Sequence, residues 1–189
     1  IKTIENNCTR MLNLINDLLD ISAIESGKLT LQKTTIEPSI YFTNYAENAM
    51  RLAAVKSIHF TTLIAPEIPP IELDPNSITQ VLDNLVSNAI KFSSPETTIT
   101  LAVKAIGKNL EIRVADQGQG IPAAEIPKLF KPFSRTSVQP TGGKKSTGLG
   151  LAIVRRIVQA HGGNIRVKSQ PGQGTEFIIH LPFISKSDN

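Results

Sequence analysis

The segment Asp74–Ser93, DPNSITQVLDNLVSNAIKFS, predicts the helix around which the fold is built. Asp74 can cap free backbone N–H groups, and Pro75 suits the first helical position because it has no N–H to satisfy. Apolar residues recur at intervals of three and four, which predicts one buried face made of Ile78, Val81, Leu82, Leu85, Val86 and Ala89.

A second, polar stripe runs along the same helix. Gln80, Asn84, Asn88 and Lys91 follow one another at intervals of four, four and three residues. An amide oxygen can bind a hard cation without adding charge, and an ammonium group can bind a phosphate. The stripe therefore indicates a ligand site, and the alternative is an ordinary amphipathic helix whose Asn side chains bond locally.

Length and composition favour one globular domain with an appendage. The chain has 189 residues, of which 40% are hydrophobic and 19% charged. Its single cysteine, Cys8, excludes an internal disulfide framework and a Cys-based zinc site. There is no apolar run of about 18 residues, so we expect a cytoplasmic domain. Because the chain begins at Ile1, we expect a fragment whose longer parent could be membrane-anchored through upstream segments.

Basic residues are concentrated in one part of the chain. The segment 126–175 contains no Asp or Glu, although the net charge of the whole chain is only +4. Such a segment favours a polyanionic ligand. A nucleotide triphosphate and a nucleic acid both qualify, but no nucleic-acid module is recognisable, so we expect no nucleic-acid partner.

The N-terminal residues 1–26 predict a long amphipathic helix that ends at Gly27. Its apolar residues follow a 4-3-4-3 spacing at Ile4, Cys8, Met11, Ile15 and Leu18. We expect this face to pack against an upstream helix or a second copy of itself. The alternative is a helix folded back on its own domain.

The remaining pattern mixes helices and strands without a regular β-α-β alternation. It predicts a fold of the α/β class, a two-layer sandwich in which helices cover one face of a mixed sheet. A helix over 38–55 is expected to turn Ile40, Tyr45, Ala49 and Leu52 inward. The expected strands are 28–33, 58–64, 71–73, 97–105, 109–115, 164–169 and 176–181.

Three glycine-containing or aromatic motifs follow the amide helix. Asp116-Gln-Gly-Gln-Gly-Ile121 comes directly after an apolar strand, and its carboxylate could accept a hydrogen bond from an exocyclic amine such as that of adenine. Lys128–Arg135 places Phe130 and Phe133 beside basic residues, a pattern that also suits core or lid packing. Thr147-Gly-Leu-Gly-Leu-Ala152 leads into a helix whose free N–H groups could bind phosphate.

In this order, the four motifs resemble the catalytic and ATP-binding domain of sensor histidine kinases. That domain has the Bergerat-type fold that is shared with gyrase, the ninety-kilodalton heat-shock chaperones and mismatch-repair ATPases. The resemblance covers 38–183, and the helix before it is similar to the second helix of a dimerisation and phosphotransfer hairpin. It implies a partial hairpin helix at 1–27, a linker at 28–37 and a catalytic domain at 38–189.

The resemblance also implies ATP and Mg²⁺ as ligands and assigns residues to them. Asn88 and Asn84 would bind the metal, while Asn84, Lys91 and Arg135 would act in catalysis. Ser134–Ser146 would form the lid over ATP, although the family often has Gly where Ser146 stands. The full set of implied ATP-binding residues is Asn84, Asn88, Lys91, Phe92, Asp116, Gly118, Gly120, Ile121, Phe133, Arg135, Thr147, Gly148, Leu149, Gly150 and Leu151.

The implied activity is transfer of the γ-phosphoryl group of ATP to a histidine on an upstream helix, for relay to an aspartate of a response regulator receiver domain. The protein would form a homodimer through its N-terminal helix. None of His59, His161 and His180 lies in a phosphoacceptor context, so we expect structural roles for them and no autophosphorylation of this chain alone. The alternatives are a non-catalytic nucleotide-binding scaffold and a serine-directed kinase of the same fold.

Overall fold

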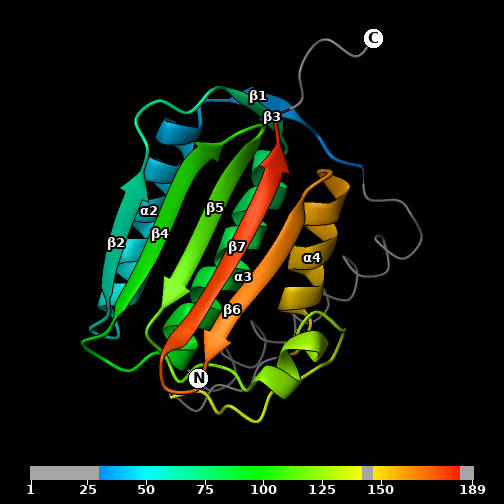
Figure 1. Ribbon diagram of the computed structural model, residues 1–189. Helices are drawn as coiled ribbons and strands as arrows, with labels where there is room; N and C mark the ends of the chain where they lie inside the picture. The colour runs from blue at the N-terminus through cyan, green and yellow to red at the C-terminus, as the bar shows by residue number, and fades with distance from the viewer. Residues whose placement is uncertain (1–29, 142–146, 184–189) are drawn as a thin grey trace, which may run out of the picture.

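The computed structural model describes residues 30–141 and 147–183. Its main sheet has the strand order β2-β4-β5-β7-β6 (Figure 1). β2 and β4 pair in parallel and the other neighbours pair antiparallel, so the sheet is mixed. The strands are β2 (His59–Ile64), β4 (Thr98–Ile106), β5 (Asn109–Asp116), β6 (Asn164–Gln170) and β7 (Gly174–Pro182).

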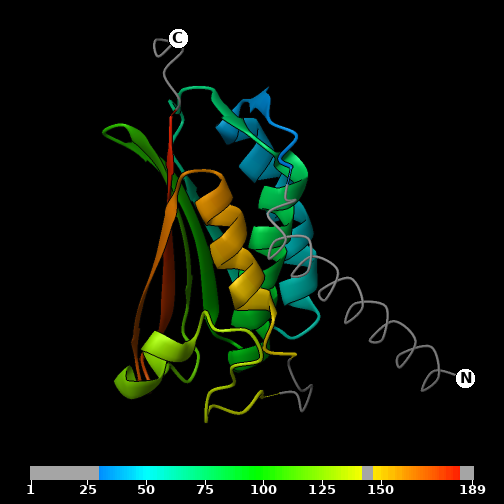
Figure 2. The ribbon, with the colours of Figure 1, turned by 90° about the vertical axis from the view of Figure 1, so that its right-hand side faces the viewer.

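Three helices cover one face of this sheet, as the edge-on view in Figure 2 shows. They are α2 (Pro38–Ala54), α3 (Pro75–Phe92) and α4 (Gly150–Ala160), and a short 3-10 helix, η1 (Ala123–Lys128), precedes α4. The predicted two-layer α/β sandwich is confirmed, whereas the predicted helix over 1–26 lies outside the described residues. No helix in the described part of the chain is long and apolar enough to cross a membrane.

The central helix, α3, forms as its sequence predicts. The Asp74 side chain accepts hydrogen bonds from the backbone N–H groups of Asn76 and Ser77 at 3.0 and 3.1 Å, and Pro75 takes the first position. All six residues of the predicted apolar stripe are buried. The helix packs on β5 and against α4, so its polar stripe is fixed relative to both.

Helix α2 ends one residue before its expected end, and its expected inner face is confirmed only in part: Ala49 is buried and Tyr45 packs against the core. Ile40 and Leu52, which we expected inside, are 63% and 61% exposed. The buried residues besides Pro38 are Phe42, Ala46, Ala49 and Ala53, spaced four, three and four residues apart. One large side chain, Phe42, and three alanines therefore make the inner face of α2.

The strand expected at 28–33 is also wrong, because residues 30–33 carry no strand. The strand is β1 (Thr34–Ile36), which pairs antiparallel with β3 (Ile71–Leu73) and lies within the segment 28–37 that we expected to be a linker. In addition, the backbone N–H of Gln32 donates to the Asp74 carboxylate at 3.0 Å. This segment is therefore attached to the start of α3.

The histidines make contacts that agree with structural roles. His161 is 5% exposed; its Nδ1 donates to the Ile157 carbonyl at 2.8 Å, and its Nε2 accepts from the Asp74 N–H at 3.1 Å. It therefore joins the end of α4 to the start of α3 as a neutral ring. His180 Nε2 lies 2.9 Å from the buried Glu111 carboxylate. His59 is exposed on the edge strand β2.

Protonation of His161 is expected to destabilise the fold. Burial is the main cause that lowers the pKa of His161 from its ordinary 6.5; Lys33 acts in the same direction and Asp74 opposes it. The unfolded chain therefore binds more protons, so the free energy of unfolding should rise with pH up to about 6.5. The free energy of unfolding, measured with urea at about pH 5 and about pH 7.5, should fall more between the higher and the lower pH for the wild type than for His161→Gln. Equal losses would contradict the assignment.

Candidate functional site

The C-terminal half of α3 carries the predicted amide stripe. The side-chain Nδ2 of Asn84 donates to the Gln80 carbonyl at 3.0 Å, which leaves its Oδ1 directed away from that turn. Asn88 lies one turn further along and is partly exposed. Lys91 Nζ lies 5.4 Å from the ring centroid of Phe92. Two amide oxygens, one ammonium and one aromatic ring thus lie on the last turns of one helix.

Asp116 ends β5 and has an oriented side chain. Its Oδ1 accepts the backbone N–H groups of Gly118 at 2.8 Å and Thr175 at 3.2 Å. No described residue donates a hydrogen bond to Oδ2. Burial, opposed by these two bonds, raises the pKa of Asp116 above its ordinary value. The turn therefore holds a desolvated carboxyl group with one oxygen left to accept a ligand.

The two glycines of this turn are required by the protein's own backbone. A Cβ on Gly118 would meet the Phe92 carbonyl oxygen at 2.8 Å, so the turn lies directly against the end of α3. A Cβ on Gly120, whose φ is +69°, would overlap the carbonyl of Gln170. The resemblance described above implies that both glycines belong to the ATP site, which stays a prediction. In the structure, the missing side chains let the Asp116 turn pack on α3 and β6.

The start of α4 lies against the other end of the stripe. A Cβ on Gly150 would overlap Asn84 Oδ1, so the first turn of α4 touches the amide of α3. The N-cap residue Leu149 offers no side-chain cap, and the first turn of α4 contains no acidic residue. A helix N-terminus without a cap has free N–H groups and a partial positive charge, which suit a phosphate.

Gly148, in the Thr147–Ala152 motif, packs against the end of the Lys128–Arg135 motif. Its φ is +78°, and a Cβ there would meet the Ser134 carbonyl oxygen at 2.8 Å and the Phe133 backbone. The Leu149 side chain is fully buried in the core, so only its backbone can serve a ligand. Thr147 Oγ1 accepts the Leu149 N–H at 3.3 Å.

Other expected site residues take less central positions. The Phe133 ring is 63% exposed, and the residue has a φ of +60°, an unusual conformation for a bulky side chain. Arg135 is exposed, and no described contact joins it to α3 or α4. The Ile121 N–H donates to Ser169 Oγ at 2.8 Å, and Leu151 packs against the core. Their expected roles toward ATP remain predictions.

The donor set around Asn84 fits magnesium only if a ligand supplies further oxygens. In the described part of the chain, no three His, Cys, Asp or Glu residues group together as a metal site. The amides of Asn84 and Asn88 can offer two neutral oxygens at most, and Mg²⁺ in such sites completes its shell with phosphate oxygens and water. The residues present therefore fit a metal that arrives with a nucleotide.

Several residues near α3 were not expected from the sequence. Thr175 fixes the Asp116 carboxylate through its N–H. Lys56 and Thr141 contact carbonyl groups at the C-terminus of α3, and no motif marks either of them. The Ser93 hydroxyl is buried and has no hydrogen-bond partner among the described residues. Ordered water or a ligand commonly satisfies such a group.

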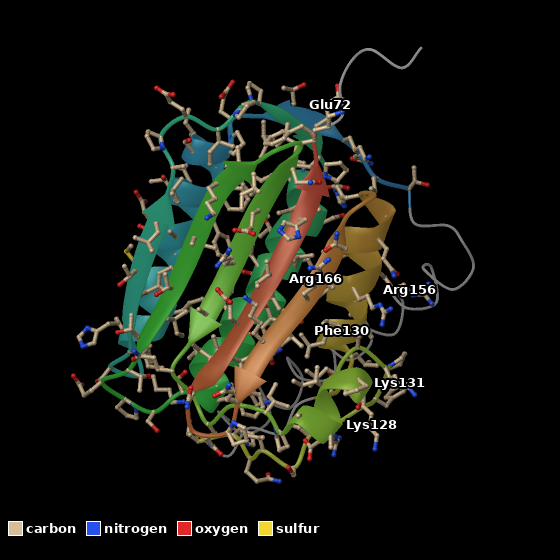
Figure 3. The ribbon with its side chains drawn as sticks, viewed as in Figure 1. Glu72, Lys128, Phe130, Lys131, Arg156 and Arg166 are labelled. Atoms are coloured by element: carbon tan, nitrogen blue, oxygen red, sulfur yellow. The ribbon has the colours of Figure 1, made fainter. Side chains whose placement is uncertain are left out.

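The basic segment forms one edge of the molecule. Figure 3 shows Lys128, Lys131, Arg156 and Arg166 along η1, the turn after it, α4 and β6. The guanidinium of Arg155 lies 5.8 Å from the centroid of the Phe130 ring. The basic residues of the segment 126–175 are therefore contributed by several elements, η1, the turn after it, α4 and β6.

Comparison with known proteins identifies the class that this fold and site define. Residues 73–185 match the family model for histidine kinase-, DNA gyrase B- and HSP90-like ATPases, and the chain belongs to this family. The matched part begins at the residue before the α3 cap and includes every motif described above.

The similar proteins are sensor histidine kinases. The sensor histidine kinase RcsC of Escherichia coli (strain K12) is 36% identical over 183 residues, which are 96% of this chain and 19% of RcsC. The structure of full-length ShkA in complex with AMPPNP matches with a TM-score of 0.81 and 30% identity, covering 95% of this chain and 37% of ShkA. The catalytic domain of the histidine kinase ThkA matches with a TM-score of 0.69 and 27% identity over 81% of this chain and 97% of that domain.

The chain is thus similar to the catalytic domain of sensor histidine kinases, and the predicted family is confirmed. It spans 19% of the length of RcsC and 30% of the length of the alginate biosynthesis sensor protein KinB of Pseudomonas aeruginosa.

Proposed function

We propose that this chain is the ATP-binding kinase domain of a two-component sensor histidine kinase. It would transfer the γ-phosphoryl group of ATP to a histidine on an upstream helix outside this chain, for relay to an aspartate of a response regulator. The observation that carries the proposal is the uncapped start of α4 lying against the Asn84 amide of α3. Free N–H groups beside the uncharged oxygen of Asn84, with Asn88 one turn further along α3, are a combination that suits a magnesium–triphosphate.

Each of the predicted site residues would have a separate role toward ATP. Oδ2 of Asp116 would accept a hydrogen bond from the exocyclic amine of adenine, and Phe92 would contact the base. Asn84 and Asn88 would hold Mg²⁺, which supplies charge neutralisation for the phosphates when it is bound. Lys91, Arg135 and the first turn of α4 would add positive charge at the terminal phosphate. Phosphoryl transfer depends mainly on such positioning and charge stabilisation.

We further propose that residues 1–27 supply part of a dimerisation hairpin and that 38–189 form the catalytic domain, with the linker at 28–37. Because the acceptor histidine would lie upstream, this chain alone should bind ATP without phosphorylating itself.

Titration of the chain with ATP, with and without Mg²⁺, tests the proposal. A kinase site should bind ATP more tightly with Mg²⁺, whereas the alternative, a non-catalytic scaffold, should show no metal dependence. Incubation with labelled ATP should leave the chain unlabelled. Acid-labile phosphohistidine on this chain would contradict the proposal that the acceptor histidine lies upstream. Absence of ATP binding would contradict the proposed function itself.

Gln80→Glu is expected to raise the basal rate of ATP hydrolysis. Gln80 lies one turn before Asn84, the position at which related ATPases of this fold are expected to have a glutamate that activates water. Because an amide cannot accept a proton, gaining a general base could increase the rate by up to about 10²-fold. Phosphate release should be compared with that of Gln159→Glu, the same change on an exposed position of α4. An unchanged rate in Gln80→Glu would contradict the prediction that Gln80 keeps the hydrolysis of ATP by water slow.

A further inference from the structure

A lysine ammonium occupies the C-terminus of α3. Lys56 Nζ donates to the backbone carbonyls of Ile90 at 2.6 Å and Ser93 at 2.7 Å, and to Thr141 Oγ1 at 2.5 Å. The Lys91 carbonyl lies further away, at 3.4 Å. The Ile90 and Ser93 carbonyls flank Lys91 and Phe92, the last two residues of α3, which both belong to the implied ATP-binding set.

The chemistry of this cluster is specific for an ammonium. The last carbonyls of a helix lack intrahelical partners and carry partial negative charge. An ammonium has three N–H donors, which match the three nearest oxygens here. Desolvation lowers the pKa of Lys56, in agreement with an ammonium enclosed by protein groups.

Lys56 lies in a turn that is hydrogen-bonded to the segment following α3. The turn contains Ser57 in a left-handed conformation with φ of 54°. The Ser57 carbonyl accepts the Glu96 N–H at 2.7 Å, and the His59 N–H donates to the Thr97 carbonyl at 2.9 Å. The backbone around Lys56 is therefore fixed to the segment that leaves α3.

Thr141 completes the cluster from another part of the chain. Its backbone N–H donates to the Lys91 carbonyl at 3.2 Å, and its hydroxyl lies within hydrogen-bond distance of the Ser93 carbonyl at 2.8 Å. Because the hydroxyl oxygen also accepts from Lys56, one ammonium holds both Thr141 and the end of α3.

We propose that Lys56 is a positioning residue of the nucleotide site, an internal cation that fixes the last turn of α3 and joins Thr141 to it. Its ammonium holds the backbone of Lys91 and Phe92, so their side chains are presented in one orientation to phosphate and base. This inference rests on the function proposed above, and it assigns a role to a residue that touches no ligand itself.

Lys56→Met and Lys56→Ala test the role. Both remove the ammonium, and we expect ATP affinity in the presence of Mg²⁺ to fall by about three- to tenfold, since hydrogen bonds from a charged donor are lost. In Lys56→Ala, added methylammonium can enter the vacated space and should restore the affinity. Tetramethylammonium at equal concentration has no N–H donor and should not. Lys108→Met, in the β4–β5 turn, is the matched control and should bind ATP as the wild type does.

Hydrogen exchange of the Thr141 amide supplies a readout independent of nucleotide. It should accelerate in Lys56→Ala and slow again with methylammonium. Affinity within twofold of the wild type, or a loss that methylammonium leaves unchanged while the urea midpoint falls, would overturn the inference. If the wild type itself bound no ATP, the proposed function would fail. Thr141 exchange would still decide whether Lys56 fixes this turn.

Discussion

Replacing Asp116 by Asn should weaken ATP binding by about 10²-fold and leave the fold intact. Asn is nearly isosteric, and its Oδ1 can still accept the N–H groups of Gly118 and Thr175. The atom directed to the ligand changes from an acceptor to an N–H donor, which would face the amine of adenine. Because burial penalises the Asp116 carboxylate, the neutral amide should keep or slightly raise the free energy of unfolding.

Comparison of ATP with inosine triphosphate makes this test sharper. Inosine lacks the exocyclic amine, so the wild type should prefer ATP and Asp116→Asn should lose that preference. Asp83→Asn is the matched control, because Asp83 is exposed on α3 and its side chain accepts from Tyr45. Equal losses of affinity for both nucleotides, accompanied by a lower urea midpoint, would show that Asp116 acts on the fold instead of the base.

The second large effect is expected at Gly120. A Cβ there would overlap the Gln170 carbonyl, and the turn is held by the hydrogen bond from Gly172 N–H to the Gln119 carbonyl at 2.7 Å. Neither backbone can move without breaking this bond, so Gly120→Ala should lower the free energy of unfolding by about 3 kcal/mol or more.

Gly172→Ala separates backbone conformation from lack of space. Gly172 has φ of +78°, but a Cβ there would meet nothing within 4 Å. Its replacement should cost only the left-handed conformation, about 1 kcal/mol. Urea unfolding of both variants measures the difference. Similar costs would mean that conformation alone, and not the contact with β6, requires glycine at 120.

In the described part of the chain, local patterns in the sequence were sufficient for the helices α2, α3 and α4 and for most strands. The Asp74 cap and the apolar spacing of α3 involve residues at most a few positions apart, so the helix and its buried face could be predicted together. The prediction for α2 was less complete. Its helical spacing was clear, but Ile40 and Leu52 looked more buried than Ala46 and Ala53, because hydrophobicity alone does not show how closely a helix approaches its sheet.

The candidate site was likewise predictable in part from the sequence, while the rest depends on tertiary contacts. Asn84, Asn88, Asp116 and Gly150 were predicted to form one site from the order of the motifs and the resemblance that they carry, and in the structure Gly118 and Gly150 lie against α3. The reason for the glycines could not be seen in the sequence, since the atoms that exclude a side chain belong to distant segments. Lys56 gave no signal for the same reason.

The sequence by itself determined the amphipathic central helix, the order of the four motifs and the class of fold, because helix caps, periodicity and glycine turns act over a few neighbouring residues. Tertiary structure alone decided that β1 begins at Thr34, that alanines form the inner face of α2 and that a lysine binds the end of α3. Each of these depends on a partner far along the chain, β3, the sheet and Thr141 respectively. Such contacts become specified only when the chain has folded and brought the partners together.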